Sequence, residues 1–235
     1  MAEANAAIRL LTSNGMHAVL DVLLPAFRGI TGNHVTVRYG TGQEILERIA
    51  AGETADVVIC SRAALQDLAR ARKVEAASVR DLATSSVGVA VRTGLPKPDV
   101  RSVEAFKRAL LGAESIAFTG KGASGIYFQR LIGQLGIAAE IRAKAVMQDG
   151  GLVGDLVAQG RATMAIQQIP ELLAVEGIDY VGPLPPELQH TTQIATGVFA
   201  GSARPAATAL VEHLADVRNG HVYREKGMET PHHGA

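Results

Sequence analysis

Residues 34–61 read HVTVRYGTGQEILERIAAGETADVVICS, and this stretch decides the fold class. Val35 to Tyr39 alternates apolar and polar residues like a β-strand, and Gln43 to Ala50 carries its apolar residues at helical spacing. Asp56 to Cys60 then has the nearly continuous apolar character of a buried strand. A strand, a helix and a second strand in this order predict parallel strands joined by a right-handed crossover.

The same alternation extends along the chain in both directions. In the first half we expect strands at 8–11 and 86–92, and helices at 16–28 and 62–72, besides the elements above. In the second half we expect strands at 115–118, 143–147, 162–166 and 193–200, and helices at 125–135, 151–159 and 205–218. The sequence therefore predicts an α/β fold of mostly parallel sheets flanked by helices.

Two irregular segments divide this series. They are Thr93 to Pro98 and Pro183 to Pro186, both rich in proline. We expect residues 1–90 and 195–235 to form one discontinuous lobe and residues 91–194 to form a second lobe. Two chain crossings, near 88–93 and 194–198, would then form a hinge, and a cleft between lobes is a common small-molecule site.

Composition limits the classes of function. The 235 residues are 47% hydrophobic and contain 23 basic and 23 acidic residues. This apolar content supports a large core, and zero net charge argues against general electrostatic binding to nucleic acid or an anionic membrane. The single cysteine, Cys60, excludes an intrachain disulfide and makes a cysteine-based metal centre unexpected. We expect no metal ion and no redox cofactor.

The N-terminus bears on the compartment. The opening MAEANAAIRLLTSNG has no basic segment followed by a long apolar one, so the sequence as written predicts a cytoplasmic protein. A processed sequence would lack its signal too, and the alternative is then the periplasm. No stretch approaches 18 uninterrupted apolar residues, and we expect no membrane insertion.

Several segments resemble a known family. They are IRLLTSNGMHAVL, TGNHVTVRYGTGQEILERIAAGETADVVICS, GVAVRTGLPKPDV, GASGIYFQRLIGQLGI and YREKGME, in this order along nearly the whole chain. Together they resemble the type 2 periplasmic-binding-like proteins, in particular the molybdate-binding proteins of ABC transporters. The resemblance implies a two-lobe fold with an anion in the cleft, and an ABC permease as partner if the protein is a transport receptor.

In that family the anion is held by hydroxyls and backbone amides. A strand-to-helix loop suits this task, because a helix N-terminus offers unpaired N–H groups and a positive dipole end. The ligand-binding residues implied here are Ser13, Asn14, Gly15, Thr41 and Ser61 from lobe one, and Lys121, Ser124, Gln167 and Gln168 from lobe two. The alternative is that these residues serve only as turns and helix N-caps, where the same residue types are favoured.

The chain departs from the molybdate pattern. The family's first-loop serine aligns with Gly15, and its lobe-two tyrosine is replaced near Gln167 and Gln168. Lys121 and Arg62 add positive charge, which would favour an organic di- or tricarboxylate through charge-assisted hydrogen bonds. We therefore expect a small oxyanion ligand, either an organic carboxylate or a molybdate-like anion.

An enzymatic branch of the same family provides the alternative function. Aconitate isomerase resembles the molybdate-binding group and moves a proton across a three-carbon allylic unit, which requires a base near the carbon acid. If this chain is such an enzyme, His17 is the candidate base, ahead of Tyr127 and Lys121.

Overall fold

The computed structural model describes residues 7–202 and 204–230, and the chain in it divides into two units. Unit 1 comprises Met1–Thr84 and Thr192–Ala235, and unit 2 comprises Ser85–Thr191. Residues 1–6, which open the segment searched for a secretion signal, lie outside the described residues. Within the described part of the chain, no helix combines the length and the apolar character needed to cross a bilayer.

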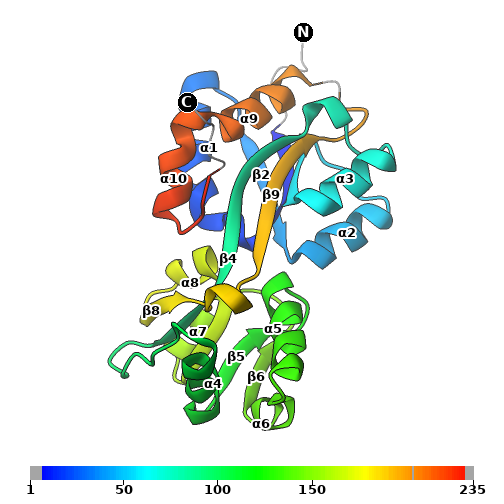
Figure 1. Cartoon of the computed structure of the whole chain (residues 1–235). Coiled ribbons are helices and arrows are strands. Elements are labelled where there is room, and N and C mark those ends of the chain that lie inside the picture. The colour runs from blue at the N-terminus through cyan, green and yellow to red at the C-terminus, as the bar shows by residue number, and fades with distance from the viewer. Residues whose placement is uncertain (1–6, 203, 231–235) are drawn as a thin grey trace. The chain divides into compact units, whose positions relative to one another are not determined.

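In unit 1 the strands follow the order β2-β1-β3-β9, and β4 (Arg80–Arg92), whose residues up to Thr84 belong to this unit, comes next to β9 (Figure 1). Strands β1, β2 and β3 are mutually parallel and β9 is antiparallel to β3. Its elements are β1 (Ile8–Ser13), α1 (His17–Thr31), β2 (Val35–Gly40), α2 (Gly42–Ala50), β3 (Val57–Ser61), α3 (Arg62–Arg70), β9 (Thr191–Val198), α9 (Pro205–Ala215) and α10 (Gly220–Glu225), with 3₁₀ turns at Asn14–Met16, Ala76–Ser78 and Val217–Asn219.

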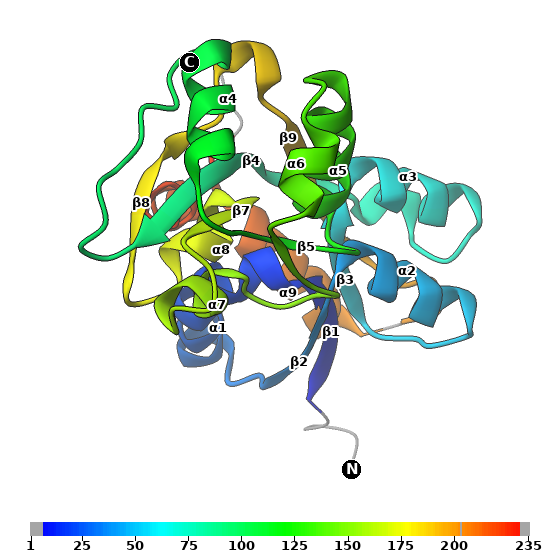
Figure 2. The same ribbon diagram turned by 90° about the horizontal axis from the view of Figure 1, so that it is seen from below.

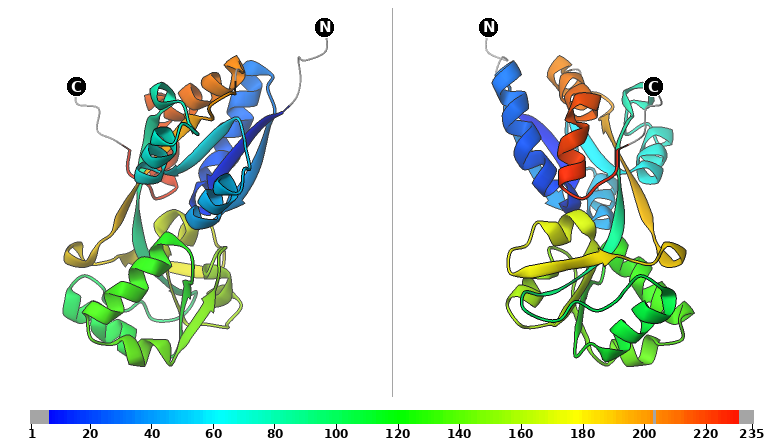
Figure 3. Two further views of the ribbon diagram at one scale, coloured as in Figure 1. Left: turned by 90° about the vertical axis from the view of Figure 1, so that its right-hand side faces the viewer. Right: turned by 60° about the vertical axis from the view of Figure 1, so that its left-hand side comes forward.

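Helices cover both faces of this sheet (Figure 3). On one face α1, α9 and α10 bury Leu20, Leu210 and Tyr223, and on the other α2 and α3 bury Ile45 and Leu65. Apolar residues therefore line both faces of the central strands, as expected for a parallel sheet covered on both sides.

Unit 2 has a five-stranded sheet in the order β8-β4-β7-β5-β6. Strand β5 is parallel to β6 and β7, whereas β4 is antiparallel to β7 and β8. The elements are β4 (Arg80–Arg92, whose residues from Ser85 on lie in unit 2), α4 (Val103–Gly112), β5 (Ile116–Thr119), α5 (Ala123–Gln134), α6 (Ala138–Arg142), β6 (Ala145–Gln148), α7 (Gly154–Ala158), β7 (Met164–Gln168), α8 (Ile169–Leu173) and β8 (Ile178–Pro183), with a 3₁₀ turn at Pro186–Leu188.

The helices of unit 2 form two groups. Figure 2 shows α4, α5 and α6 on one side of the sheet and α7 and α8 on the other. The first group packs Phe106, Phe128 and Ile141 against β5 and β7, and the second packs Leu156 and Leu172 against the same strands. Each unit thus encloses its own apolar cores.

The predicted α/β class is confirmed, since parallel strands alternate with helices in both units. The chain crosses between the units at 84/85 and 191/192, whereas the sequence suggested 90/91 and 194/195. The difference at the first crossing arises because β4 is one continuous strand. Its residues Val87 to Val91 already pair with β7 of unit 2, so the crossing falls inside the strand and not at its end.

Candidate functional site

The carboxyl ends of β1, β2 and β3 meet at one edge of the unit 1 sheet. Ser13 lies opposite Gly40, and Thr12 lies opposite Tyr39 on one side and Ile59 on the other. Each of these strands leads directly into a helical segment. The predicted unit 1 residues Ser13, Asn14, Gly15, Thr41 and Ser61 therefore gather along this edge.

Two of these hydroxyls cap helices. Thr41 Oγ1 accepts a hydrogen bond from the backbone N–H of Glu44 at 3.2 Å, and the Glu44 carboxylate accepts from the Thr41 N–H at 2.7 Å. Ser61 Oγ accepts from the N–H of Ala64 at 3.3 Å. A hydroxyl that accepts a backbone N–H keeps its own proton available for donation. Capping and anion binding are thus compatible at Thr41 and Ser61.

Thr12, which the sequence analysis did not select, is fully buried next to Ser13. Its hydroxyl has no hydrogen-bond partner among the described residues. Ser13 is half-buried, and its side chain makes no capping bond to the turn that follows. Because a buried hydroxyl without a partner is unfavourable, Thr12 marks a place where an added acceptor would stabilise the protein.

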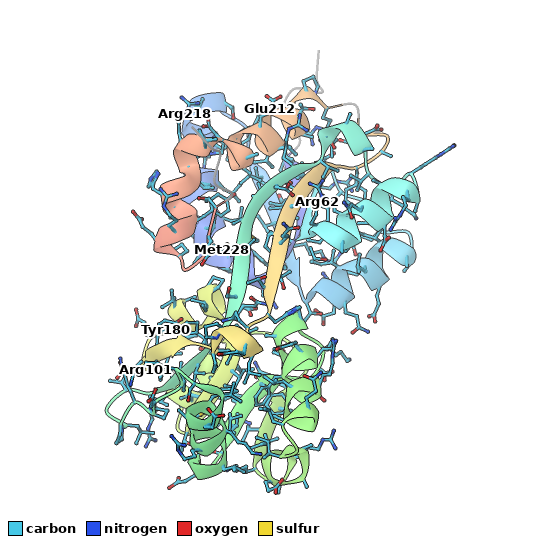
Figure 4. The ribbon with its side chains drawn as sticks, in the orientation of Figure 1. Arg62, Arg101, Tyr180, Glu212, Arg218 and Met228 are labelled. Atoms are coloured by element: carbon cyan, nitrogen blue, oxygen red, sulfur yellow. The ribbon has the colours of Figure 1, made fainter. Side chains whose placement is uncertain are left out.

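The charged residues of this edge are already paired. Arg62, at the start of α3, lies 2.7 Å from the Asp81 carboxylate (Figure 4). His17 Nδ1 lies 3.2 Å from Asp21, and its ring stacks on Tyr39 with 4.4 Å between centroids. Burial, together with the charge of Asp21, raises the pKa of Tyr39 to about 12, so this phenol stays neutral. The unit 1 edge therefore offers mainly neutral donors.

Cys60 lies inside this edge and does not contribute a nucleophile. Its side chain is buried, and burial raises the pKa of the thiol to about 12. A thiolate is the reactive form of cysteine. Cys60 therefore packs as a small apolar residue in the core of unit 1.

Unit 2 has a corresponding edge. Strands β5, β6 and β7 are parallel, with Thr119 opposite Gln148 and Ala117 opposite Ala165. Thr119 and Gln167 each lie two residues beyond the last paired positions of β5 and β7, which are Ala117 and Ala165. The predicted residues Lys121, Ser124, Gln167 and Gln168 gather at this edge, in the loops and strand ends around Thr119.

The hydroxyl of Thr119 is the second buried hydroxyl without a partner among the described residues. It lies against the first turn of α5, where a Cβ atom on Gly122 or Gly125 would come within 2.4 Å or 2.6 Å of Oγ1. Gly122, the N-cap residue of α5, provides no side-chain hydrogen bond to the helix. An orphan hydroxyl therefore adjoins a helix N-terminus without a side-chain cap.

The polar residues Lys121, Ser124 and Tyr127 of unit 2 differ in their contacts. Lys121 Nζ lies 2.9 Å from the Asp149 carboxylate, and both side chains are exposed. Ser124 is buried in the first turn of α5. Tyr127 donates its hydroxyl proton to the carbonyl of Leu188 at 2.7 Å.

The two glutamines lie inside β7, two residues later than the predicted end of this strand. Gln167 Oε1 accepts from the N–H of Val153 at 2.9 Å, and Nε2 donates to the carbonyl of Gly151 at 2.8 Å. The side-chain amide of Gln168 lies 2.6 Å from the hydroxyl of Ser85. Gln167 thus helps to hold the 149–153 loop, whereas Gln168 bonds to strand β4. The contact of either amide with a ligand stays a prediction.

Glu171 is a third residue that the sequence analysis did not select. It lies in the first turn of α8, and its carboxylate is hydrogen-bonded by the backbone of Gln168 and by the side chain of Gln167. Its position three residues after the N-cap residue Gln168, in QQIPE, is the sequence signal that could have identified it. Thr12 and Thr119 gave no such signal, because only tertiary structure shows that their hydroxyls lack partners.

The described residues contain no group of three or more His, Cys, Asp or Glu side chains arranged to hold a metal ion.

The chain is similar to known proteins along most of its length. The model of a family described as bacterial extracellular solute-binding protein matches residues 8–229. An aconitate isomerase from Pseudomonas sp is 34% identical over 229 residues, which cover 94% of this chain and 87% of that enzyme.

Solved structures of anion-binding proteins have the same fold. The periplasmic molybdate-binding protein of Azotobacter vinelandii superposes with a TM-score of 0.80 at 16% identity, covering 95% of this chain and 99% of that one. A sulfate-binding protein of Mycobacterium tuberculosis gives a TM-score of 0.76 at 20% identity, covering 97% of this chain and 88% of that one. At these identities the likeness concerns the fold.

Proposed function

Because this chain belongs to the bacterial extracellular solute-binding protein family, we propose that it captures a small oxyanion at strand-to-helix loops. The observation that carries the proposal is the pair of unpartnered, buried hydroxyls of Thr12 and Thr119. Each lies at the carboxyl end of a buried strand, and the next α-helix along the chain has more than two turns. An anion supplies the acceptors that these hydroxyls and the neighbouring N–H groups lack.

The ligand class that we propose is an organic di- or tricarboxylate. The donors along both edges are mostly neutral hydroxyls and amides, which suit a carboxylate as well as a tetrahedral oxyanion, and the cations Arg62 and Lys121 are paired with Asp81 and Asp149. Carboxylates accept several hydrogen bonds over a larger volume than a tetrahedral oxyanion needs. The Pseudomonas relative at 34% identity, named for aconitate, points to the same class of compound.

Ligand-induced stabilisation tests this proposal. Thermal unfolding of the purified chain is followed with molybdate, tungstate, sulfate, citrate, cis-aconitate and trans-aconitate. A ligand that binds only the folded state raises the unfolding temperature in a concentration-dependent way. We expect a rise with at least one polycarboxylate. No rise with any of these anions would refute the capture of a small oxyanion.

The second candidate function is an allylic proton shift of the aconitate isomerase type, favoured by the 34% identity over 94% of this chain. His17 is the first base to test, because its imidazole lies 3.2 Å from the Asp21 carboxylate. A carboxylate partner fixes the orientation of an imidazole ring. Incubation with cis- or trans-aconitate in D₂O, followed by NMR, distinguishes the functions: an isomerase incorporates deuterium and forms the other isomer, whereas a binding protein does neither.

We also propose a periplasmic location and an ABC permease as partner, on the basis of the family and of the periplasmic molybdate-binding relative. Release of the protein from intact cells by osmotic shock, with a cytoplasmic enzyme as control, tests the location. Loss of anion uptake on deletion of an adjacent permease gene tests the partner.

A further inference from the structure

The carboxyl group of Glu171 lies next to Gln167 and Gln168 at the unit 2 edge. Glu171 belongs to α8, which follows β7 without an intervening loop. Its side chain is only partly exposed. The backbone of Gln168 and the side chain of Gln167 both hydrogen-bond the carboxylate. The bond to Gln168 is the return half of a capping box, because Gln168 is the N-cap residue and Glu171 the third helical residue.

Gln167 connects this carboxyl to the candidate binding loops. Its amide also holds the 149–153 loop, through the N–H of Val153 and the carbonyl of Gly151. At the start of that loop, Asp149 accepts from the backbone N–H of Lys121 at 3.2 Å and pairs with its ammonium at 2.9 Å. Glu171 is thus linked through continuous contacts to the β5–α5 loop, where Thr119 and the N-terminus of α5 lie.

No positive charge balances this carboxyl among the described residues. Glu171 forms no salt bridge there. Helix α8 packs mainly against β7 and β8, and its residues Ile169 and Leu172 also lie against β4 and α7. The charged residues of β4 and α7, which are Arg80, Asp81, Arg92 and Asp155, are not among the groups that shift the pKa of Glu171. Strand β7 carries no titratable side chain. Strand β8 carries Asp179, which lies near the Thr93 hydroxyl, and Tyr180, labelled in Figure 4. Burial raises the pKa of Tyr180, so this phenol is neutral as well.

These surroundings favour the uncharged carboxyl. Burial raises the pKa of Glu171 to about 8, although the hydrogen bonds from Gln168 and Gln167 act in the opposite direction. Near neutral pH the group is therefore mostly protonated, and it loses its proton in mildly alkaline solution.

We propose that Glu171 couples anion binding at the unit 2 edge to the uptake of a proton. The inference rests on the proposed function, in that the anion binds at the loops that Gln167 and Asp149 hold. A bound anion adds negative charge near a carboxyl that has no cation partner. It therefore disfavours the carboxylate and favours the neutral acid. By linkage, the neutral acid favours the bound anion to the same extent.

The linkage fixes the direction in which anion affinity changes with pH. The affinity is highest where Glu171 is already neutral, and it falls as the pH rises above the pKa of the free protein. Each unit by which the anion raises the pKa of Glu171 corresponds to about a tenfold loss of affinity across that range. A purely structural cap would stabilise α8 without giving this pH profile.

Calorimetric titration of the full chain with trans-aconitate and with sulfate, at several pH values between 7 and 9.5, tests the coupling. Both probes keep a constant charge over this range. Buffers of different ionisation enthalpy report the protons taken up on binding. For the natural chain we expect net proton uptake near pH 8 and a several-fold rise in Kd between pH 7 and 9.5.

Two variants complete the experiment. Glu171→Gln keeps the size and the hydrogen-bonding capacity but does not titrate, so it should bind the probe at pH 7 within about twofold of the natural chain, with no proton uptake and a flat pH profile. Glu176→Gln changes an exposed glutamate in the same unit and should keep the natural profile.

The outcomes separate the inference from the proposed function. Binding that is independent of pH in the natural chain, or a pH profile that persists in Glu171→Gln, overturns the coupling but leaves anion capture intact. Absence of binding by either probe at every pH overturns both. If Glu171→Gln does not fold, NMR of the natural chain with ¹³C-labelled glutamate decides: a carboxyl pKa that the probe leaves unchanged overturns the coupling.

Discussion

Removal of the Thr12 hydroxyl should change stability and anion binding in opposite directions. The hydroxyl is buried and unpartnered, so Thr12→Val should raise the free energy of unfolding by about 1 kcal/mol while it weakens anion binding about tenfold. Thr119→Val should behave in the same way in unit 2. Chemical denaturation and calorimetry measure the two effects.

Thr196 provides the matched control for this substitution. It is also fully buried in unit 1, but its hydroxyl donates to the carbonyl of Val58 at 3.1 Å. Thr196→Val should therefore lower the free energy of unfolding by about 1 kcal/mol and leave anion affinity unchanged. Equal stability changes in Thr12→Val and Thr196→Val would contradict the assignment of Thr12.

Glu171 should affect stability in a pH-dependent manner. Its pKa of about 8 in the folded chain exceeds the value of about 4.3 for an unfolded glutamate, so between these values the folded state holds the extra proton. The stabilising contribution of this proton is complete below pH 4 and is lost as the pH rises to 8, by at most about 1.4 kcal/mol per pH unit. In Glu171→Gln this loss should be absent. Urea denaturation of the natural chain and of Glu171→Gln at pH 5 and pH 8 measures this loss of stability. An equal loss in both chains would contradict the role of Glu171.

Part of the site could be predicted from residue type alone. Hydroxyls at the starts of helices, such as Thr41 and Ser61, follow from the order of strand, polar residue and amphipathic helix. The partners of a buried side chain depend on segments far away in the sequence. Gln167 illustrates this, because its amide bonds to Gly151 and Val153, and no local pattern indicates these contacts.

At the scale of elements, the approach of α5 to the end of β5 requires glycine. A Cβ atom on Gly125 would lie 1.8 Å from the backbone oxygen of Thr119, and neither backbone segment can move without disturbing the edge. Gly125→Ala should therefore lower the free energy of unfolding by about 3 kcal/mol or more. Thermal and urea denaturation measure this change.

Helix α5 also contains a control position for Gly125→Ala. Gly133 lies in α5, no atom lies within 4 Å of the point that its Cβ atom would occupy, and its φ is not in the left-handed region. Gly133→Ala should raise stability by about 0.5–1 kcal/mol, because alanine loses less backbone entropy in a helix. A similar loss in both variants would mean that helix propensity, and not the close approach to Thr119, explains the effect at Gly125.

Helix α4 and strand β8 are two of the elements that could not be recognised from the sequence, and each case has a physical reason. Helix α4 carries Ser102 as its N-cap and buries Phe106 and Leu110, so its signals were present and were obscured by the preceding proline-rich segment. Strand β8 is half-buried and contains Gly182 and Pro183, residues that are rare in strands. Its assignment depends on pairing with residues 88–92 of β4, which lie far from it along the chain.

At the scale of the whole molecule, the apolar cores predict how the chain can be divided. Every member of the two unit 2 cores lies between Val87 and Leu188, and every member of the two unit 1 cores lies outside residues 85–191. Unit 2 is moreover continuous in sequence. Residues 85–191 alone should therefore fold and unfold cooperatively, because they contain every member of these two cores.

A fragment with the lobe boundaries that the sequence suggested, residues 91–194, is the control for residues 85–191. Residues 91–194 lack Val87, Val89 and Ala90, which are fully buried, and most of the pairing between β4 and β7. Loss of these side chains and ladder hydrogen bonds should leave an edge of β7 unpaired and the fragment without a cooperative transition. Circular dichroism during thermal unfolding compares the two fragments. Cooperative unfolding of both would mean that β4 contributes little to unit 2, and cooperative unfolding of neither would mean that unit 2 needs unit 1 to fold.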